Sequence, residues 1–205
     1  VVSPYTQPLA VKMERELGIP FISLHMLYAV KDIDRAYADI AERFSFSWDN
    51  AFRDERKEAL MLEEQARKKL AGLTFALLPR IDVTLPLSLY LVDLGMEPLL
   101  LHLEAFYPED RDHAGKIVST GYNPWICRMV NPDADIPVLE KLAPDLCFGY
   151  LPPDNKTIAC VPEMFDFYGQ TGYARTSSLI KRILGVLDEV DMPVKGRVEY
   201  GAAPV

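Results

Sequence analysis

Several patterns that assign a function directly are absent from this sequence of 205 residues. No G-x-G-x-x-G or G-x-x-x-x-G-K-[S/T] motif occurs, so a glycine-rich loop that cradles nucleotide phosphates is not indicated. No apolar run approaches the roughly 20 residues of a membrane span, and no signal peptide is visible. We therefore expect a cytoplasmic protein. The chain opens on VVSPYTQ without an initiator methionine, which predicts that it is part of a longer protein.

Cysteine and histidine are scarce, with three of each. Cys127, Cys147 and Cys160 are separated by 20 and 13 positions, which fits neither a C-x-x-C metal knuckle nor a disulfide framework, so we expect buried thiols. His102 and Glu104 can point the same way from a strand end, but two residues do not define a metal site. A hydrogen-bonded structural histidine is the stronger prediction there.

Positive charge is also sparse. The 22 lysines and arginines are outnumbered by 30 acidic residues, the formal net charge is -8, and no basic cluster matches a phosphate backbone. Nucleic acid is therefore not expected as the main partner. With 49% hydrophobic and 25% charged residues, the composition is that of an ordinary globular protein.

The periodicity of the apolar residues changes near residue 73. Before it, apolar residues at helical spacing predict helices at 5–17, 32–44 and 52–70, with a short buried strand at 19–24. The helix at 52–70 is rich in Glu, Arg and Lys, which predicts a mostly solvated connector between two lobes.

After residue 73, strands and helices alternate. Strands are predicted at 73–78, 97–103, 126–130, 146–150 and 157–161, and helices at 84–94, 109–119, 136–142 and 172–189. Alternation of this kind requires parallel pairing with right-handed crossovers, so the predicted fold is an α/β, Rossmann-like doubly wound parallel sheet with part of a second lobe.

These elements predict four regions. They are the end of a preceding α/β lobe at 1–49, a connecting helix at 50–71, a Rossmann-like domain at 72–192, and a tail at 193–205. In open α/β sheets, ligands bind beyond the carboxyl ends of the strands, where the strand order reverses. That rule nominates ten ligand-binding candidates: Arg80, Asp82, His102, Glu104, Tyr150, Glu163, Phe165, Asp166, Tyr168 and Tyr173.

The chemistry at these positions stays open. Arg80 can meet a ligand anion or pair with Asp82, and the ion pair is the commoner arrangement. The aromatic residues of the loop at 165–173 can line a pocket, form a subunit contact or belong to the core. No catalytic residue is assigned by these patterns.

Four segments together resemble the nitrogenase component 1-type oxidoreductase family, which comprises the molybdenum-iron protein subunits and the related cofactor-assembly scaffolds. They are LAVKMERELGIPFISL at 9–24, LYLVDLGMEPLLL at 89–101, KLAPDLCFGY at 141–150 and CVPEMFDFYGQTGYARTSSLIKRIL at 160–184. The order of the segments matches the family over about residues 3 to 190. The resemblance implies stacked Rossmann-like domains of the chelatase type.

The chain departs from the family at three ligand positions. The cofactor cysteine should fall near Val2 or Ser3, a Gly-Gly turn should fall at Arg80 and Ile81, and a histidine ligand should lie in the loop at 165–173. None of these is present. These departures predict that this segment binds neither a cofactor nor a metal. An iron-sulfur cluster, if the full-length protein has one, is expected to be bound by other parts of it.

Three functional hypotheses follow. The resemblance implies an oxidoreductase or cofactor-assembly subunit in a hetero-oligomer, with a homologous component 1-type subunit and an ATP-dependent iron-sulfur reductase as partners, and with neither nucleic acid nor a membrane. The alternative is a non-enzymatic bilobal binding module for a metal chelate or a small anion. The third is a structural partner subunit with its aromatic loop at an interface.

Overall fold

A five-stranded parallel sheet organises the chain. The computed structural model describes residues 1–48, 51–79, 81, 83–104, 106, 110–128, 131–149, 151, 158–162, 164 and 170–189. The strands are β1 (Thr74–Leu77), β2 (Glu97–His102), β3 (Trp125–Cys127), β4 (Leu146–Phe148) and β5 (Cys160–Val161). They lie in the order β3-β2-β1-β4-β5, and every neighbouring pair is parallel. The predicted doubly wound parallel sheet is confirmed.

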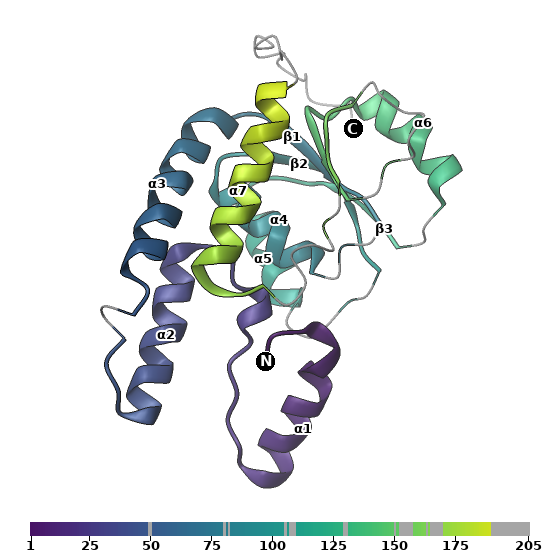
Figure 1. The fold of residues 1–205 in the computed structure, drawn as a ribbon. Helices are drawn as coiled ribbons and strands as arrows, with labels where there is room; N and C mark the ends of the chain where they lie inside the picture. Colours follow the sequence, from purple (N-terminus) through teal and green to yellow (C-terminus); the bar gives the residue numbers. More distant parts are fainter. Residues whose placement is uncertain are drawn as a thin grey trace.

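The helices cover the sheet unevenly. They are α1 (Gln7–Leu17), α2 (Val30–Phe44), α3 (Arg53–Leu70), α4 (Thr84–Asp93), α5 (Asp110–Ser119), α6 (Pro132–Leu142) and α7 (Gly172–Glu189), with short 3-10 turns at Pro4–Thr6 and Leu24–Met26. Figure 1 shows α3, α4, α5 and α7 on one side of the sheet and α6 on the other. The helix α1 extends away from the sheet, beside the N-terminus.

Alternating side chains of the central strands build the two cores. Phe75 and Leu77 of β1 belong to the larger cluster, which also contains residues of α3, α4 and α7. Ala76 and Leu78 belong to a smaller cluster that includes Leu139 of α6. Successive residues of a strand point to opposite faces, and a parallel sheet is covered on both. This is why the sequence at 73–78 reads as a continuous apolar run.

The helix α3 lies along α7 rather than standing in solvent. Ala59, Ala66 and Leu70 are fully buried. Lys181 of α7 bonds Glu58 at 2.6 Å, and Lys69 bonds Asp188 at 2.7 Å. The prediction of a mostly solvated helix therefore holds only for the charged face of α3. The few alanines and leucines of α3 form a narrow stripe that packs against α7.

Two predicted elements differ from the structure. The segment 19–24 belongs to no sheet in the described part of the chain: Val1 bonds to the Ile22 carbonyl and the Leu24 N–H, but this single contact does not extend into a strand. The helix predicted from residue 136 begins at Pro132 instead. The Asn131 side chain accepts a hydrogen bond from the Ala134 N–H and a proline occupies the first turn, which are both helix-start signals.

Among the described residues, no helix is both long enough and apolar enough to cross a membrane.

Candidate functional site

The strand order places a switch point between β1 and β4. From β1 the chain winds outward to β2 and β3, whereas β4 lies on the other side of β1 and is followed by β5. The loops after β1 and β4 therefore diverge from neighbouring strand ends. A crevice outside the carboxyl ends of such strands is the usual ligand position in this class of fold.

Gly149 lets the two loops meet at this point. It follows β4 with φ +101°, and a Cβ atom placed on it would lie 2.9 Å from the carbonyl oxygen of Pro79 and 3.4 Å from Cδ1 of Ile81. The Gly149 N–H donates to the Val161 carbonyl at 3.0 Å, and the Leu78 N–H donates to the Phe148 carbonyl at 2.8 Å. The ends of β1, β4 and β5 are thus held together around a residue without a side chain.

Replacing Gly149 with alanine is expected to lower the free energy of unfolding by about 2 kcal/mol or more, because the added methyl group would overlap a backbone carbonyl and the backbone conformation is left-handed. Urea denaturation measures the change. The control is Gly115→Ala, since a Cβ at Gly115 within α5 has no neighbour within 4 Å. A Gly149 variant as stable as this control would contradict the close approach of the loops.

A buried hydroxyl joins the loop after β1 to the end of β2. The Thr84 Oγ1 lies 3.0 Å from the carbonyl oxygen of Ile81 and 2.9 Å from that of His102. Both carbonyls share the single hydroxyl proton as acceptors. This contact fixes the backbone at the position where His102 leaves the sheet.

Among the nominated residues that the structure describes, His102 has buried ring nitrogens without hydrogen-bond partners. It is 1% exposed, and neither ring nitrogen has a hydrogen-bond partner in the part of the chain that the structure describes. Leu101 and Leu103 point into the larger core cluster, so His102 points to the opposite, α6 side of the sheet. The expectation of a hydrogen-bonded histidine is therefore not met among the described residues. Buried polar atoms without partners are rare and call for an explanation.

A thiol and a carboxylate lie on the same side of the sheet. Cys127 of β3 is the register partner of His102. Burial, and to a smaller extent the nearby Asp135 carboxylate, raises the pKa of the Cys127 thiol. The Asp135 Oδ2 atom of α6 is itself buried without a hydrogen-bond partner in the described chain. The sequence analysis missed Asp135, although the Asn131 cap and Pro132 place it in the first turns of α6.

The other two thiols are held in their neutral form. Burial raises the pKa of Cys147 to about 12 and the pKa of Cys160 to about 11. Cys160 lies next to the switch point, and its Sγ donates to the Gly149 carbonyl at 3.4 Å. All three cysteines are free, but of the three thiols expected to be buried only Cys147 is fully buried, and Cys127 and Cys160 are partly buried. A thiol binds metal as the thiolate, which these surroundings disfavour.

Tyr173 is engaged in a contact between helices. It lies in the first turn of α7, is 2% exposed, and donates to the Asp34 Oδ1 of α2 at 2.6 Å. Arg56 of α3 donates to both Asp34 oxygens at 2.9 and 2.7 Å. Partial burial alone would raise the pKa of Asp34, but the bonds from Arg56 and Tyr173 outweigh it and the pKa is lowered. Asp34 of α2 thereby joins α7, through Tyr173, to α3, through Arg56.

A buried arginine follows Tyr173 by two positions. Arg175 is 5% exposed, and its guanidinium donates to the His25 carbonyl and, at 2.6 Å, to the Tyr28 hydroxyl. The guanidinium carbon also lies 4.0 Å from the centroid of the Tyr28 ring. This cation–π contact and the two bonds attach α7 to the segment that precedes α2. No local pattern in the sequence indicates this long-range contact.

The remaining candidates divide into two groups. Glu104 is exposed beyond the end of β2. Seven nominated positions lie outside the described residues and stay predictions: Arg80, Asp82, Tyr150, Glu163, Phe165, Asp166 and Tyr168. In the described part, no three His, Cys, Asp or Glu side chains gather closely enough to hold a metal ion.

Two shallow hollows lie elsewhere, on the outer surface of α3. Their volumes are about 380 and 400 Å³, and Lys57 and Met61 line both of them. Arg53, Arg56 and Glu64 line one of them. Charged side chains on an open helix surface are a solvated face, so we place the candidate site at the switch point instead.

The all-parallel sheet and its strand order define a doubly wound, Rossmann-like α/β domain. Comparison with known proteins identifies its family, because the model of the nitrogenase component 1 type oxidoreductases matches residues 1–188. The chain belongs to this family. No match is found among curated protein sequences.

Two solved structures share the fold. One, described as nitrogenase Cp1 at pH 6.5, aligns with a TM-score of 0.72 and 18% identity over 96% of this chain and 45% of its own. The other, nitrogenase Cp1 at pH 5, aligns with a TM-score of 0.63 and 17% identity over 91% of this chain and 46% of its own. The chain thus spans less than half the length of the structures it matches.

Proposed function

We propose that this chain is a domain of a nitrogenase component 1-like oxidoreductase or cofactor-assembly subunit, and that it supplies scaffold rather than cluster ligands. The match of the family model over residues 1–188 is the observation that carries the proposal. In this role the full-length protein receives electrons from an ATP-dependent iron-sulfur reductase and works in a hetero-oligomer with a homologous subunit. A cytoplasmic location is part of this proposal.

The described residues at the switch point do not fit a metal cluster bound by this chain. Ile81 is 4% exposed, and its Cδ1 lies near Gly149, where a cluster would require bare backbone. The nearest thiol, Cys160, is held neutral by burial and donates to a carbonyl. This supports a non-ligating partner subunit or a divergent relative that acts on another metal compound or macrocycle.

The alternative is a binding module for a metal chelate or a small anion, and one observation favours it. The two ring nitrogens of His102 and the Oδ2 atom of Asp135 are buried polar atoms without partners among the described residues. A small polar ligand at the carboxyl ends of β2 and β3 would satisfy such atoms. In this reading, Arg80, Asp82 and Tyr150 are proposed as further ligand contacts.

Iron and sulfide analysis of the full-length protein, purified without oxygen, separates the two functions. The oxidoreductase is expected to contain iron and sulfide in stoichiometric amounts and to show charge-transfer absorption that bleaches when an ATP-dependent iron-sulfur reductase is added with ATP. A colourless, metal-free protein would contradict electron transfer. That result would support the binding module.

A matched variant tests the assignment of ligands. Replacing Cys127, Cys147 and Cys160 together with serine is expected to leave the iron content of the full-length protein unchanged. Loss of iron in a variant that still folds, as judged by circular dichroism, would show that this segment ligates a cluster after all.

A further inference from the structure

Two of the three thiols are neighbours on adjacent strands. Cys147 of β4 and Cys160 of β5 are register partners in the parallel sheet. The Cys147 N–H donates to the Ala159 carbonyl at 2.8 Å, and the Gly149 N–H donates to the Val161 carbonyl at 3.0 Å. Because backbone hydrogen bonds hold the two strands together here, the sheet fixes the register of the two cysteines.

The two cysteine side chains point to the same face of the sheet. Register partners on neighbouring strands share a face. Cys147 belongs to the smaller core cluster, and Cys160 packs against that cluster. Burial, and after it the nearby Cys160 thiol, raises the pKa of Cys147, which agrees with a short distance between the two groups.

The spacing of a parallel sheet suits a disulfide bond at this position. Neighbouring strands lie about 4.8 Å apart, which is within the range of about 4.4 to 6.8 Å that separates the Cα atoms of a disulfide. The Cβ atoms of a disulfide lie about 1 Å closer than this strand spacing. The strand β5 can make such a shift, because it is the edge strand and contains only two residues.

The two thiols differ in their access to solvent. Cys147 is fully buried, whereas Cys160 is partly buried. A dissolved oxidant therefore reaches Cys160 first, and Cys147 is the neighbouring thiol that can complete the reaction.

We propose that Cys147 and Cys160 are a dithiol that oxidises reversibly to a disulfide, with a low-molecular-weight disulfide as the oxidant. The Cys160 thiolate attacks the oxidant and releases one of its two thiolates, which leaves a mixed disulfide on Cys160. The Cys147 thiolate then attacks the Cys160 sulfur and releases the second thiolate. The protein loses two protons and two electrons, and the oxidant becomes two thiols.

The disulfide changes a contact at the switch point. In the reduced form the Cys160 Sγ donates to the Gly149 carbonyl at 3.4 Å. A disulfide sulfur has no proton to donate, so oxidation removes this donor from the end of β4. The dithiol needs neither a cluster nor a reductase, and it is therefore independent of the proposed oxidoreductase function.

Peptide mapping of the full-length protein tests the pair. Trypsin cleaves after Lys141, Lys156 and Arg175, so the two cysteines fall on separate peptides, 142–156 and 157–175. The folded protein is kept overnight with oxidised glutathione, because burial keeps both thiols neutral and the exchange slow. After alkylation of the remaining thiols, mass spectrometry is expected to find most of the two peptides joined by a disulfide. Dithiothreitol is expected to separate them.

The third cysteine and the unfolded chain provide the controls. Cys127 lies beside His102 on another pair of strands, so Cys127→Ser is expected to leave the linked fraction unchanged. In urea the fold is lost, and Cys127 is then expected to pair with the other two cysteines as well. Three outcomes would overturn the proposal: free Cys147 in the folded, oxidised protein, Cys160 found only as the mixed disulfide with glutathione, or equal linkage of Cys127 in the folded protein.

Discussion

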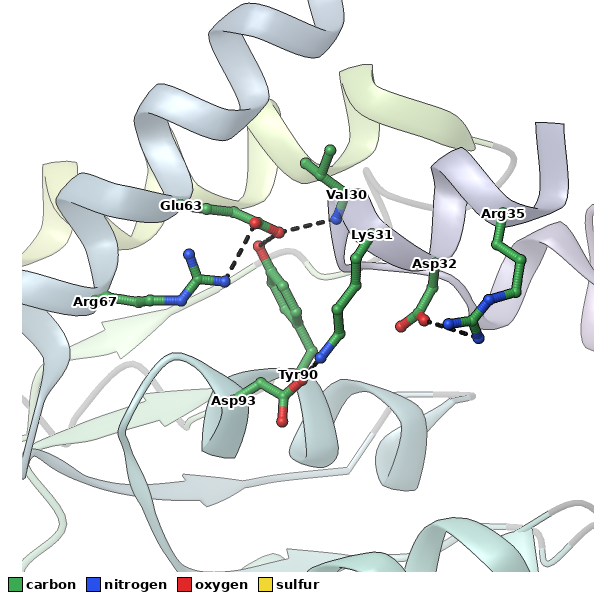
Figure 2. A network of polar contacts seen from close by, with 8 residues as sticks. All are labelled: Val30, Lys31, Asp32, Arg35, Glu63, Arg67, Tyr90 and Asp93. Carbon is green, nitrogen blue, oxygen red and sulfur yellow. Dashed lines mark hydrogen bonds and ion pairs between the residues drawn. The ribbon is translucent and has the colours of Figure 1, made fainter. Parts of the chain in front are cut away.

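Replacing Glu63 with alanine is expected to lower the free energy of unfolding by about 3 kcal/mol or more, because it leaves buried donors without an acceptor. Glu63 lies in α3 and is 3% exposed. Its Oε1 accepts hydrogen bonds from the Val30 N–H of α2 at 3.0 Å and from the Tyr90 hydroxyl of α4 at 3.3 Å. Figure 2 shows this carboxylate between the three helices, with Arg67 on its other oxygen.

The start of α2 explains why this carboxylate matters. Ala29 precedes the helix and has no side chain that can accept a hydrogen bond from the first turn. Glu63 takes that role from another helix, and its negative charge also suits the positive end of the α2 dipole. Burial, together with the Glu63 charge, raises the pKa of Tyr90, so the phenol stays a donor.

The adjacent acid provides a matched control. Glu64 is exposed and pairs with Lys68, one turn along the same helix, at 2.7 Å. Glu64→Ala is expected to leave the stability nearly unchanged, because an exposed ion pair contributes little. Glu63→Gln retains an acceptor oxygen and is expected to fall between the two. Urea denaturation of the three variants measures this ranking, and a Glu63→Ala variant as stable as Glu64→Ala would refute the network.

Replacing Gly172 with alanine is expected to destabilise the protein by about 3 kcal/mol or more. Gly172 begins α7 with φ +69°, and a Cβ atom placed on it would lie 2.1 Å from the Tyr37 hydroxyl oxygen. Tyr37 is not free to move aside, because its ring packs on Trp48, Phe52 and Tyr173. The strain would therefore spread through the contact between α2 and α7.

Two further variants separate the causes. Gly185→Ala, in the same helix with no neighbour within 4 Å, is expected to stabilise the protein by about 0.5 to 1 kcal/mol. Adding Tyr37→Phe to Gly172→Ala removes the overlapping oxygen and is expected to restore part of the loss, leaving the cost of the left-handed conformation. No restoration in this double-mutant cycle would show that the overlap is not the cause.

Three contacts between distant segments of the chain share one feature. Glu63, Tyr173 and Arg175 each reach a partner on the segment at 25–34. That segment is thereby attached to α3 and α7, on the larger-core side of the sheet.

The local patterns of the sequence were sufficient to predict the elements of the sheet and the family. Apolar runs at 73–78, 97–103 and 146–150, separated by helical periods, required parallel strands with crossovers, because hydrophobic periodicity depends only on neighbours in the chain. The ordered motifs then indicated a family that the model over residues 1–188 confirms.

The side chains that act together are known only from the folded structure. The sequence contains no sign that Glu63 would cap α2, that His102 would point to the α6 side beside Cys127, or that Tyr173 would donate to Asp34. Such contacts join residues far apart in the chain, so no local pattern encodes them. For the same reason the short strand predicted at 19–24 was wrong: a strand is completed by neighbours that a local pattern does not supply, and the structure assigns no strand to this segment.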